Sequence, residues 1–403
     1  MPVPPSPTER DVEAPDAGPE GHAEPQRRRR WLKPLAWTLA VALVVCAAAI
    51  GGYAWHLRRT VSDNVQRAPL LPDAPAEHRI VPQDDKGNLV DSSGKVVTDQ
   101  QGKPVDAGAA HVDAKGQIVD QQGKPILSGG KPILGTASEE VAQPKKVATS
   151  KNSLNYLVLG SDSRGSDQGR SDVIVVAHVS DDRKRVDLVH FPRDLYVTIP
   201  GRGKNKINAA YQYGGAPLLV QTIQPLIGVP IDHVATIDFN GFTSMTDAIG
   251  GVDVPTESGV RHFDGTQGLA WVRERYGLNQ GDISRGKRQM AFIRAVLTKG
   301  LSRDVLLNPR KFSSYLDAGT RNMTVDSGFT VDEMQKVALS MRNVRGSDIH
   351  TTTAPWVAAE PGPNNMSIVV MSRSQMSKLA EHLRTDSMAT YVDNVSPKQG
   401  FGG

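Results

Sequence analysis

The segment that decides the fold runs from residue 154 to residue 191 and reads LNYLVLGSDSRGSDQGRSDVIVVAHVSDDRKRVDLVHF. Its apolar runs at 156–159 and 173–176 are continuous rather than alternating, and Gly, Ser and Asp bound them. Runs of this kind are typical of strands that are buried on both faces of a sheet. We therefore predict strands at these two runs and at 186–191 and 234–238, with helical patterns following at 215–227, 240–249 and 284–301.

Strands that alternate with helices predict a layered α/β domain. The expected fold is an α/β/α arrangement with a central mixed sheet, and we assign it to residues 151–385. Residues 386–403 are expected to form a flexible C-terminal tail.

Composition narrows the class of protein. The chain has 403 residues, with 47 Lys and Arg against 43 Asp and Glu, which gives a formal net charge of +4. This balance is too mild for a nucleic-acid coat, so no nucleic-acid partner is expected. Cys46 is the single cysteine of the chain, which excludes an intrachain disulfide and a Cys-based zinc site.

The N-terminal region predicts a membrane anchor. Residues 1–34 are rich in Pro, Glu and Ala and end in a basic cluster, whereas residues 35–55 carry no charge. A helix of that length spans the bilayer core, and the positive-inside rule places the basic cluster in the cytoplasm. A cleaved signal peptide is the alternative, but the apolar run is too long for one. We expect a disordered cytoplasmic tail, a single transmembrane helix and an extracytoplasmic remainder.

Residues 56–150 contain an internal repeat. The pattern Asp-x-x-Gly recurs, usually with Lys and then Val or Ile after it, and it starts at Asp84, Asp91, Asp99, Asp113 and Asp120. Asp and Gly favour tight turns. The segment from His56 to Asn155 has no aromatic residue between its ends, so we expect it to lack a core and to act as a stalk. One carboxylate per turn argues against a calcium site.

Charged side chains gather where the predicted strands end. Five arginines and two aspartates share this position: Arg164, Arg170, Arg193, Arg273 and Arg275, with Asp162 and Asp172. Guanidinium groups hold phosphate oxygens bidentately, and carboxylates hold Mg²⁺ or Mn²⁺. The set therefore predicts a site for a pyrophosphate bound through a divalent metal.

Spacing refines this site. Arg273 and Arg275 differ by two, so on a strand they would share one face. In the helix predicted at 284–301, Arg285 and Gln289 fall on the edge of the buried face near the helix N-terminus, a natural phosphate site. Arg288 falls on the opposite side. Pro192 is expected to end the strand before it and to project Arg193 into the same cleft as Asp162.

Eight sequence blocks then resemble one family throughout. In chain order they are NYLVLGSDSRG, GRSDVIVVAHV, FPRDLYVTIPG, KINAAYQYGG, IDHVATIDFNGF, DAIGGV, AWVRER and DISRGKRQ. They are similar to the LytR-CpsA-Psr family, strongly over residues 155–300 and more weakly to about residue 385. The repeat segment is not part of that family's core.

The resemblance implies an Mg²⁺-dependent phosphotransferase of cell-wall assembly. Such an enzyme transfers a glycopolymer-phosphate from a polyprenyl-pyrophosphate carrier to the 6-hydroxyl of N-acetylmuramic acid in peptidoglycan, forming a phosphodiester. Teichoic acid is one such glycopolymer, and the sequence does not distinguish it from capsule or another wall polysaccharide. The lipid tail would need an apolar pocket between the sheet and the helices.

The resemblance also assigns roles. Asp162 and Asp172 would hold Mg²⁺, with Mn²⁺ as a possible substitute, and Arg193 and Arg275 would act with Asp162 in catalysis. Asp194 would orient Arg193. The substrate-binding residues would be Arg164, Arg170, Arg273, Arg285 and Gln289, with Lys206 and Asn208 at the rim.

Two other functions stay open on the sequence alone. The first is a non-catalytic receptor or regulator that holds polyprenyl phosphate or an anionic wall polymer. The second is a metal-dependent polyprenyl-pyrophosphate hydrolase, which would differ from the transferase only in using water as the acceptor. The two aspartates favour catalysis over simple binding.

Overall fold

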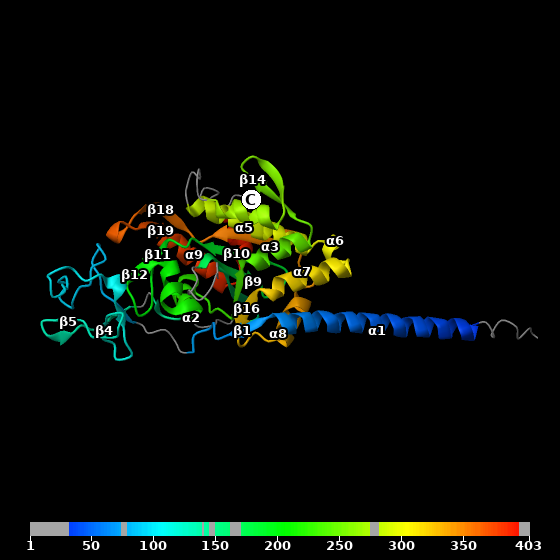
Figure 1. Ribbon diagram of the computed structural model, residues 1–403, viewed down its shortest axis with the longest axis horizontal. Helices are drawn as coiled ribbons and strands as arrows, with labels where there is room; N and C mark the ends of the chain where they lie inside the picture. Colours follow the sequence, from blue (N-terminus) through cyan, green and yellow to red (C-terminus); the bar gives the residue numbers. More distant parts are fainter. Residues whose placement is uncertain are drawn as a thin grey trace, which may run out of the picture. The chain divides into compact units, whose positions relative to one another are not determined.

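Figure 1 shows the computed structural model. It describes residues 32–73, 79–138, 141–144, 150–161, 171–274 and 282–394. The chain divides into two compact units, Met1–Trp55 and His56–Gly403. The described part of the first unit is helical and belongs to α1 (Leu32–Asn64). Within the part of the chain that the structure describes, no helix is both long enough and apolar enough to cross a membrane. Most of the predicted cytoplasmic tail, residues 1–31, lies outside the described residues.

The second unit contains a seven-stranded sheet, which we call the central sheet. Its strands lie in the order β1-β16-β13-β8-β9-β10-β17. Pairing is parallel between β8 and β13 and antiparallel between β8 and β9, so the sheet is mixed, as the sequence predicted. The strands are β1 (Gln66–Ala68), β8 (Leu154–Ser161), β9 (Ser171–Val179), β10 (Val186–Phe191), β13 (His233–Asp238), β16 (Met323–Asp326) and β17 (Ile349–Thr353).

The second unit also contains helices, which are interspersed among its strands. They are α2 (Ile207–Ile227), α3 (Phe239–Ala248), α4 (Gly265–Arg273), α5 (Asp282–Gly300), α6 (Arg303–Leu306), α7 (Pro309–Arg321), α8 (Val331–Ser340), α9 (Arg373–Arg384) and α10 (Met388–Asn394). Helix α2 begins eight residues before its predicted start, and it is broken where Gly215 has φ of 63°.

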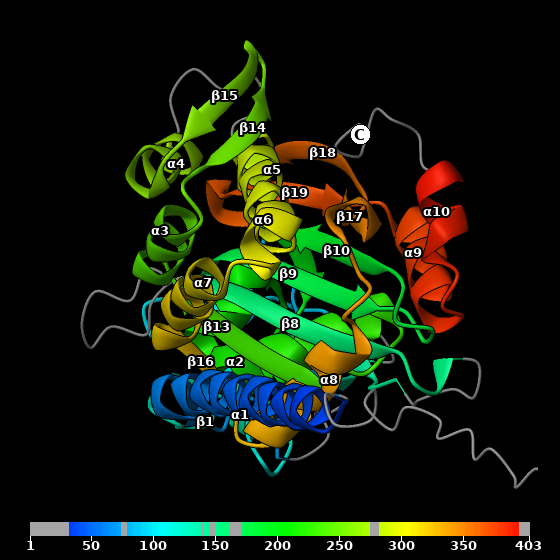
Figure 2. The same cartoon turned by 90° about the vertical axis from the view of Figure 1, so that its right-hand side faces the viewer.

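Side chains alternate across the central sheet and meet different helices on its two faces. Leu157 and Leu159 of β8 belong to a core that α2 and α9 complete. Tyr156 and Val158 of the same strand belong to a core that includes Met290 of α5. Figure 2 shows α5 and α2 on opposite sides of these strands. Because both faces are covered, continuous apolar runs form the strands.

Smaller sheets complete the second unit. A four-stranded sheet has the order β12-β11-β19-β18, and a hairpin joins β14 to β15. Their bounds are β11 (Leu195–Thr198), β12 (Lys204–Lys206), β14 (Val252–Thr256), β15 (Gly259–Phe263), β18 (Trp356–Pro361) and β19 (Ser367–Met371).

The end of α1 and strand β1 are attached to the α/β part of the second unit. Asn64 Nδ2 donates to Asp317 Oδ1 of α7 at 2.9 Å, and Arg58 pairs with Asp332 of α8 at 2.7 Å. Strand β1 then pairs in parallel with β16. These residues fall inside the segment predicted to be a stalk, so that boundary is wrong at its N-terminal end.

The repeats form a folded unit, which we call the repeat module (residues 79–137). It contains short strands and one 3-10 turn: β2 (Arg79–Ile80), η1 (Ala107–Ala109), β3 (His111–Val112), β4 (Ile118–Val119), β5 (Leu127–Ser128), β6 (Lys131–Pro132) and β7 (Thr136–Ala137). Its buried core includes Val81, Leu89 and Ile118, each fully buried. The expectation of a segment without a core is therefore wrong, because small aliphatic side chains supply the core that aromatic residues do not.

The C-terminal boundary also differs from the prediction. Met388 and Tyr391 of α10 are buried in the same core as α2. Asp386 accepts a hydrogen bond from the backbone N–H of Asp181 at 2.9 Å. The folded unit thus extends beyond residue 385 to at least Asn394, and residues 395–403 of the predicted tail lie outside the described residues.

Candidate functional site

Four strands, β8, β9, β10 and β13, end or begin at one edge of the central sheet. Strands β8 and β13 run parallel, and Ser161 is opposite Asp238 at their last residues. Strand β9 runs the other way and begins at this edge, with Ser171 opposite Ser161. Strand β10 ends there as well, with Phe191 opposite Ile174. Residues that directly follow β10 and β13, or begin β9, therefore lie at the same edge of the central sheet.

Arg193 lies in the turn between β10 and β11, at this edge. Strand β10 ends at Phe191, so Pro192 terminates it as predicted. The carbonyl oxygen of Arg193 accepts a hydrogen bond from the backbone N–H of Asn208 at 3.2 Å. Asn208 lies in the first turn of α2, and this bond ties the Arg193 turn to the N-terminus of that helix. The predicted rim residues Lys206 and Asn208 thus lie beside Arg193.

A polar pocket opens at this junction. It has a volume of about 290 Å³, and its lining includes Arg193, Asp194, Lys206 and Asn208. Lys206 Nζ lies 3.2 Å from Asp194 Oδ1, and both side chains are mostly buried. Asp194, which was expected to orient Arg193, pairs with Lys206, so its effect on Arg193 stays a prediction.

The first turns of α5 lie against β10. Arg285 and Gln289 are 5% and 6% exposed, in agreement with their predicted place on the edge of the buried face. A Cβ added to Gly286 would lie 2.4 Å from His190 Cε1, so glycine lets the helix approach β10 closely. Burial, with a smaller effect of the positive Arg285, lowers the pKa of His190 to about 4. His190 therefore stays neutral beside the arginine at pH 7.

Arg273 does not lie on a strand. It is the last residue of helix α4, which begins with a capping box between Asp264 and Gln267. The prediction that Arg273 lies on a strand is wrong, because the cap starts a helix that continues to Arg273. The Arg273 guanidinium lies 4.2 Å from the ring centre of Phe239, the residue that follows β13. Arg273 is therefore brought to the same edge by a different element. Arg288, which was predicted to fall on the opposite side of α5, forms ion pairs with Glu257 and Glu274.

Several predicted site residues fall outside the described part of the chain: Asp162, Arg164, Arg170 and Arg275. Asp172 is described only in its backbone, as the second residue of β9. Asp162 follows Ser161 in the sequence, and the backbone of Asp172 lies beside the end of β8. Among the described residues no cluster of three or more His, Cys, Asp or Glu side chains could hold a metal. The roles of these residues stay predictions.

Sequence reasoning missed part of the pocket wall. Asn205, Gln212 and Tyr213 line it beside Arg193. Gln212 and Tyr213 lie one helical turn after Asn208 and Ala209 on α2, a spacing that puts them on the same face. That spacing was visible in the sequence, but Asn205 precedes the helix and carries no such signal.

Three elements place a cationic residue near this edge of the central sheet: the β10–β11 turn has Arg193, α4 has Arg273 and α5 has Arg285. Guanidinium groups bind phosphate oxygens bidentately. When packing already fixes them, they lose little conformational entropy on binding. The arrangement suits a phosphorylated substrate, and α/β sheets commonly bind ligands at such strand ends.

Comparison with known proteins identifies the class. The model of the LytR_cpsA_psr family matches residues 131–385. This range covers most of the chain and includes the central sheet from β8 onward together with α2 to α9. The chain belongs to the LytR-CpsA-Psr family, as its sequence blocks predicted.

Two relatives illustrate the similarity. The chain is 35% identical over 227 residues to "polyisoprenyl-teichoic acid--peptidoglycan teichoic acid transferase TagU" of Enterococcus faecalis, with 52% of this chain and 73% of that protein covered. It is also 35% identical over 242 residues to the "probable cell wall biosynthesis protein LcpB" of Corynebacterium glutamicum. That match covers 53% of this chain and 57% of LcpB, so the chain spans little more than half of that relative.

Solved structures share the fold. The crystal structure of B. subtilis TagV matches with a TM-score of 0.50 at 24% identity, covering 59% of this chain and 98% of that chain. Protein gbs0355 from Streptococcus agalactiae matches with a TM-score of 0.52 at 20% identity, covering 60% of this chain and 92% of that chain. These likenesses establish a mixed α/β fold with a central mixed sheet.

Proposed function

We propose that this protein is a glycopolymer transferase of the bacterial cell wall. It moves a glycopolymer-phosphate from a polyprenyl-pyrophosphate carrier to the 6-hydroxyl of N-acetylmuramic acid in peptidoglycan. The observation that carries the proposal is that Arg193, Arg273 and Arg285 each lie near the edge where β8, β10 and β13 end. The name of the relative TagU supports teichoic acid as one class of donor.

The reaction forms one P–O bond and breaks another. The acceptor hydroxyl oxygen attacks the phosphorus that carries the glycan, and the bond from that phosphorus to the bridging oxygen breaks. Polyprenyl phosphate leaves with the bonding electrons, and the hydroxyl proton passes to solvent or to the leaving phosphate. Such a transfer depends mainly on positioning and on neutralising charge on the phosphate oxygens.

The arginines perform those tasks in the proposed mechanism. Arg285 is almost fully buried, so its guanidinium is held in a region of low dielectric where a charge interaction is stronger than in water. Arg193 follows a proline that fixes the direction of the chain at the strand end. The neutral His190 adds no second positive charge next to Arg285.

The sequence supports Mg²⁺ as the cation of this site. Asp172 is the second residue of β9, at the edge where β8 ends, and Asp162 follows β8 directly in the sequence. Hard oxygen ligands of this kind suit Mg²⁺, with Mn²⁺ as a substitute. The bound ion would supply positive charge that offsets the charge of the pyrophosphate. Asp162 and Asp172 would hold it.

We also propose that the uncharged segment 35–55, of which residues 35–42 are described only in their backbone, anchors the protein in the cell membrane, with the N-terminus in the cytoplasm and the α/β part outside. The uncharged segment 35–55 and the basic residues before it support this topology. A reporter fused after Gly403 that is active only outside the cytoplasm agrees with it. Activity only in the cytoplasm contradicts it.

The central experiment uses the full chain in detergent with a polyprenyl-pyrophosphate glycan, Mg²⁺ and peptidoglycan oligomers. Mass analysis should find a glycan joined to peptidoglycan through a phosphodiester. Free glycan phosphate without conjugate would indicate a hydrolase, and unchanged donor would indicate a receptor. Asp172→Asn should abolish product formation and Mn²⁺ binding measured by electron paramagnetic resonance. Asp253→Asn, at an exposed carboxylate of β14, is the matched control.

A further inference from the structure

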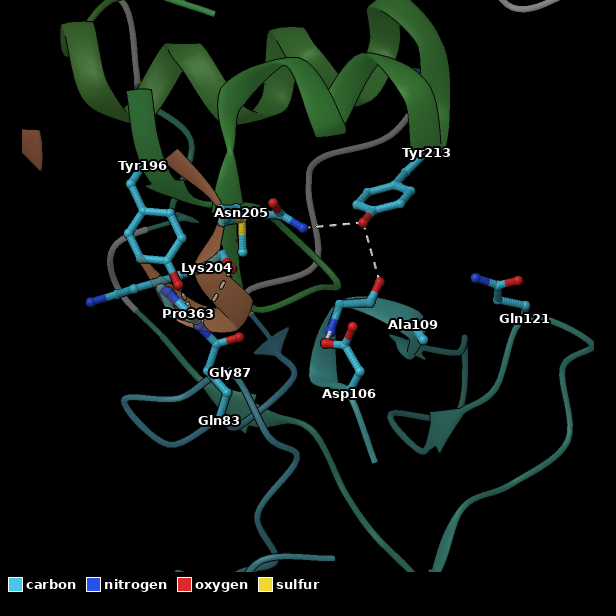
Figure 3. Close-up of a pocket in the computed structure, with 12 residues that line it drawn as sticks. Gln83, Gly87, Asp106, Ala109, Gln121, Tyr196, Lys204, Asn205, Tyr213 and Pro363 are labelled. Carbon is cyan, nitrogen blue, oxygen red and sulfur yellow. Dashed lines mark hydrogen bonds between the residues drawn. The ribbon is translucent and has the colours of Figure 1, made fainter. Parts of the chain in front are cut away.

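A second pocket lies where the repeat module meets the four-stranded sheet and α2 (Figure 3). Its volume is about 320 Å³, within the range of small-molecule sites. The repeat module contributes Gln83, Asp106 and Gln121 to its wall. The opposite wall comes from the α/β part of the unit and includes Tyr196 and Lys204.

This pocket adjoins the one beside Arg193. Asn205 and Tyr213 line both pockets, so they form the partition between them. Tyr213 lies one helical turn after Ala209 on α2, and Asn205 lies in β12. A ligand that extends past these two side chains would have one end beside Arg193 and the other end against the repeat module.

The repeat module is fixed in place at this wall. Val81 N–H donates to the Arg202 carbonyl oxygen at 2.6 Å, and Val112 N–H donates to the Gly201 carbonyl oxygen at 2.7 Å. A Cβ added to Gly203 would lie 2.3 Å from Gln83 Oε1, so a side chain there would displace the Gln83 amide from this wall. The pocket is thus formed by an ordered contact and not by a loosely attached segment.

Both tyrosines of the pocket are held by hydrogen bonds across the contact. Tyr213 Oη donates to the Gly108 carbonyl oxygen at 3.2 Å and accepts from Asn205 Nδ2 at 3.1 Å, as Figure 3 shows. The Arg202 guanidinium lies 4.3 Å from the centre of the same ring. Tyr196 Oη accepts from Gln83 Nε2 at 3.2 Å. Rings fixed in this way lose little freedom when a ligand binds.

The chemistry of the lining matches a sugar. A pyranose has hydroxyl groups around its rim and apolar C–H groups on its faces. The side-chain amides and the Asp106 carboxylate can exchange hydrogen bonds with the hydroxyl groups. The tyrosine rings and Met366 offer apolar surface to a sugar face. Among the described residues of the lining, Lys204 is the one cation, which is too little to recognise a polyanion by charge alone.

We propose that this pocket is a saccharide subsite that binds one sugar ring of a substrate whose phosphate lies beside Arg193. The inference rests on the proposed function, because it takes the glycan from that reaction. The sugar comes either from the donor glycopolymer or from the peptidoglycan acceptor. The residues that the repeat module gives to this wall lie between 83 and 121, outside the range 131–385 that the family model matches. One wall of the proposed subsite therefore comes from outside the region that the family shares.

Binding to the full chain in detergent tests the proposal with two variants. Gln121→Ala removes one amide from the wall, and Ala109→Trp fills the pocket. Gln122→Ala is the matched control, because Gln122 is the next residue of the same turn and does not line the pocket. Three probes are titrated by calorimetry: a prenyl-pyrophosphate disaccharide, a peptidoglycan glycan oligomer and a prenyl pyrophosphate without sugar.

We expect Gln121→Ala to weaken a sugar-bearing probe about five- to tenfold, the effect of one hydrogen bond, and Ala109→Trp to weaken it more. The sugar-free probe should bind all variants equally. The probe that is affected identifies the donor or the acceptor as the source of the sugar. Unchanged binding of both sugar-bearing probes, or no binding of either to the unsubstituted chain, overturns the subsite. Absence of transfer with sugar-dependent binding retained overturns only the proposed function.

Discussion

The repeat module and the central sheet reach order in different ways. In the module, each turn is closed by its own aspartate: Asp99 Oδ1 accepts from the backbone N–H groups of Gln101 and Lys103, both at 2.9 Å. Gly102 then takes φ of 79°. In the central sheet the partners come from distant parts of the chain, as where β8 pairs with β13.

This difference teaches where each region can carry function. Local turns give the module a rigid outline from a small aliphatic core, and polar side chains remain free to line a wall. The sheet instead brings together groups that are far apart in sequence, such as His190 of β10 and Arg285 of α5. Substitutions in the central sheet should therefore lower activity or the free energy of unfolding more than substitutions in the repeat module do.

The largest effect is expected at the site edge. Arg193→Lys keeps the charge but removes the guanidinium fork, so transfer should fall several hundredfold, about 3–4 kcal/mol in the transition state. Product formation by mass analysis measures it, with circular dichroism as a check on folding. Arg342→Lys, at an exposed arginine, should leave transfer unchanged. Near-normal transfer by the Arg193 variant would mean that the site lies elsewhere.

The next effect concerns the core of the central sheet. Leu157 is fully buried, so Leu157→Ala should lower the free energy of unfolding by about 3 kcal/mol through lost burial and the cavity left behind. Denaturant unfolding measures the change. Leu127→Ala in the module, where the side chain is 51% exposed, should cost under about 1 kcal/mol. Equal losses would refute the contrast between the two regions.

The third effect is a dependence of the free energy of unfolding on pH, which arises from His190 in the central sheet. The pKa of His190 is lowered from 6.5 to about 4 in the folded state, mainly by burial. Between those values the unfolded chain binds more protons, so the free energy of unfolding falls as the pH falls through this window, by up to about 3 kcal/mol. His190→Gln should lose less stability than the unsubstituted protein between pH 7 and pH 4. The same acid dependence in both proteins would contradict the neutral, buried imidazole.

The smallest effect is expected in the module. Asp99→Ala removes the acceptor of two backbone N–H groups that water can partly replace, so it should cost about 1 kcal/mol. Asp99→Asn keeps the acceptor oxygen and should cost less. Thermal unfolding compares the two. A loss as large as that of Leu157→Ala would show that the turns stabilise the module cooperatively with the sheet.

Much of the sheet could be predicted from the sequence because burial on both faces leaves a plain signal. The strand predicted at 186–191 has those bounds in the structure, and the one predicted at 234–238 begins one residue earlier. The helix predicted at 284–301 is α5 within two residues. Long apolar patterns of this kind depend on the chain's own periodicity and little on distant partners.

The prediction failed where the signal was short or compositional. The two-residue spacing of Arg273 and Arg275 indicated a strand, whereas the capping box at Asp264 and Gln267 indicated the helix that forms. The lack of aromatic residues in the repeats suggested no core. Closed turns reduce the entropy that such a core must offset, so small side chains suffice.

Strand β1 has a consequence for how the chain is tethered. One residue separates the end of α1 from β1, and β1 already pairs with β16 in the central sheet. The chain then leaves through the repeat module and re-enters the same sheet at β8. The repeats are therefore an excursion from the sheet and not a spacer in front of it. Adding or deleting repeats would enlarge or shrink the wall that the repeat module gives to the pocket in Figure 3. The distance from the end of α1 to the sheet would stay the same.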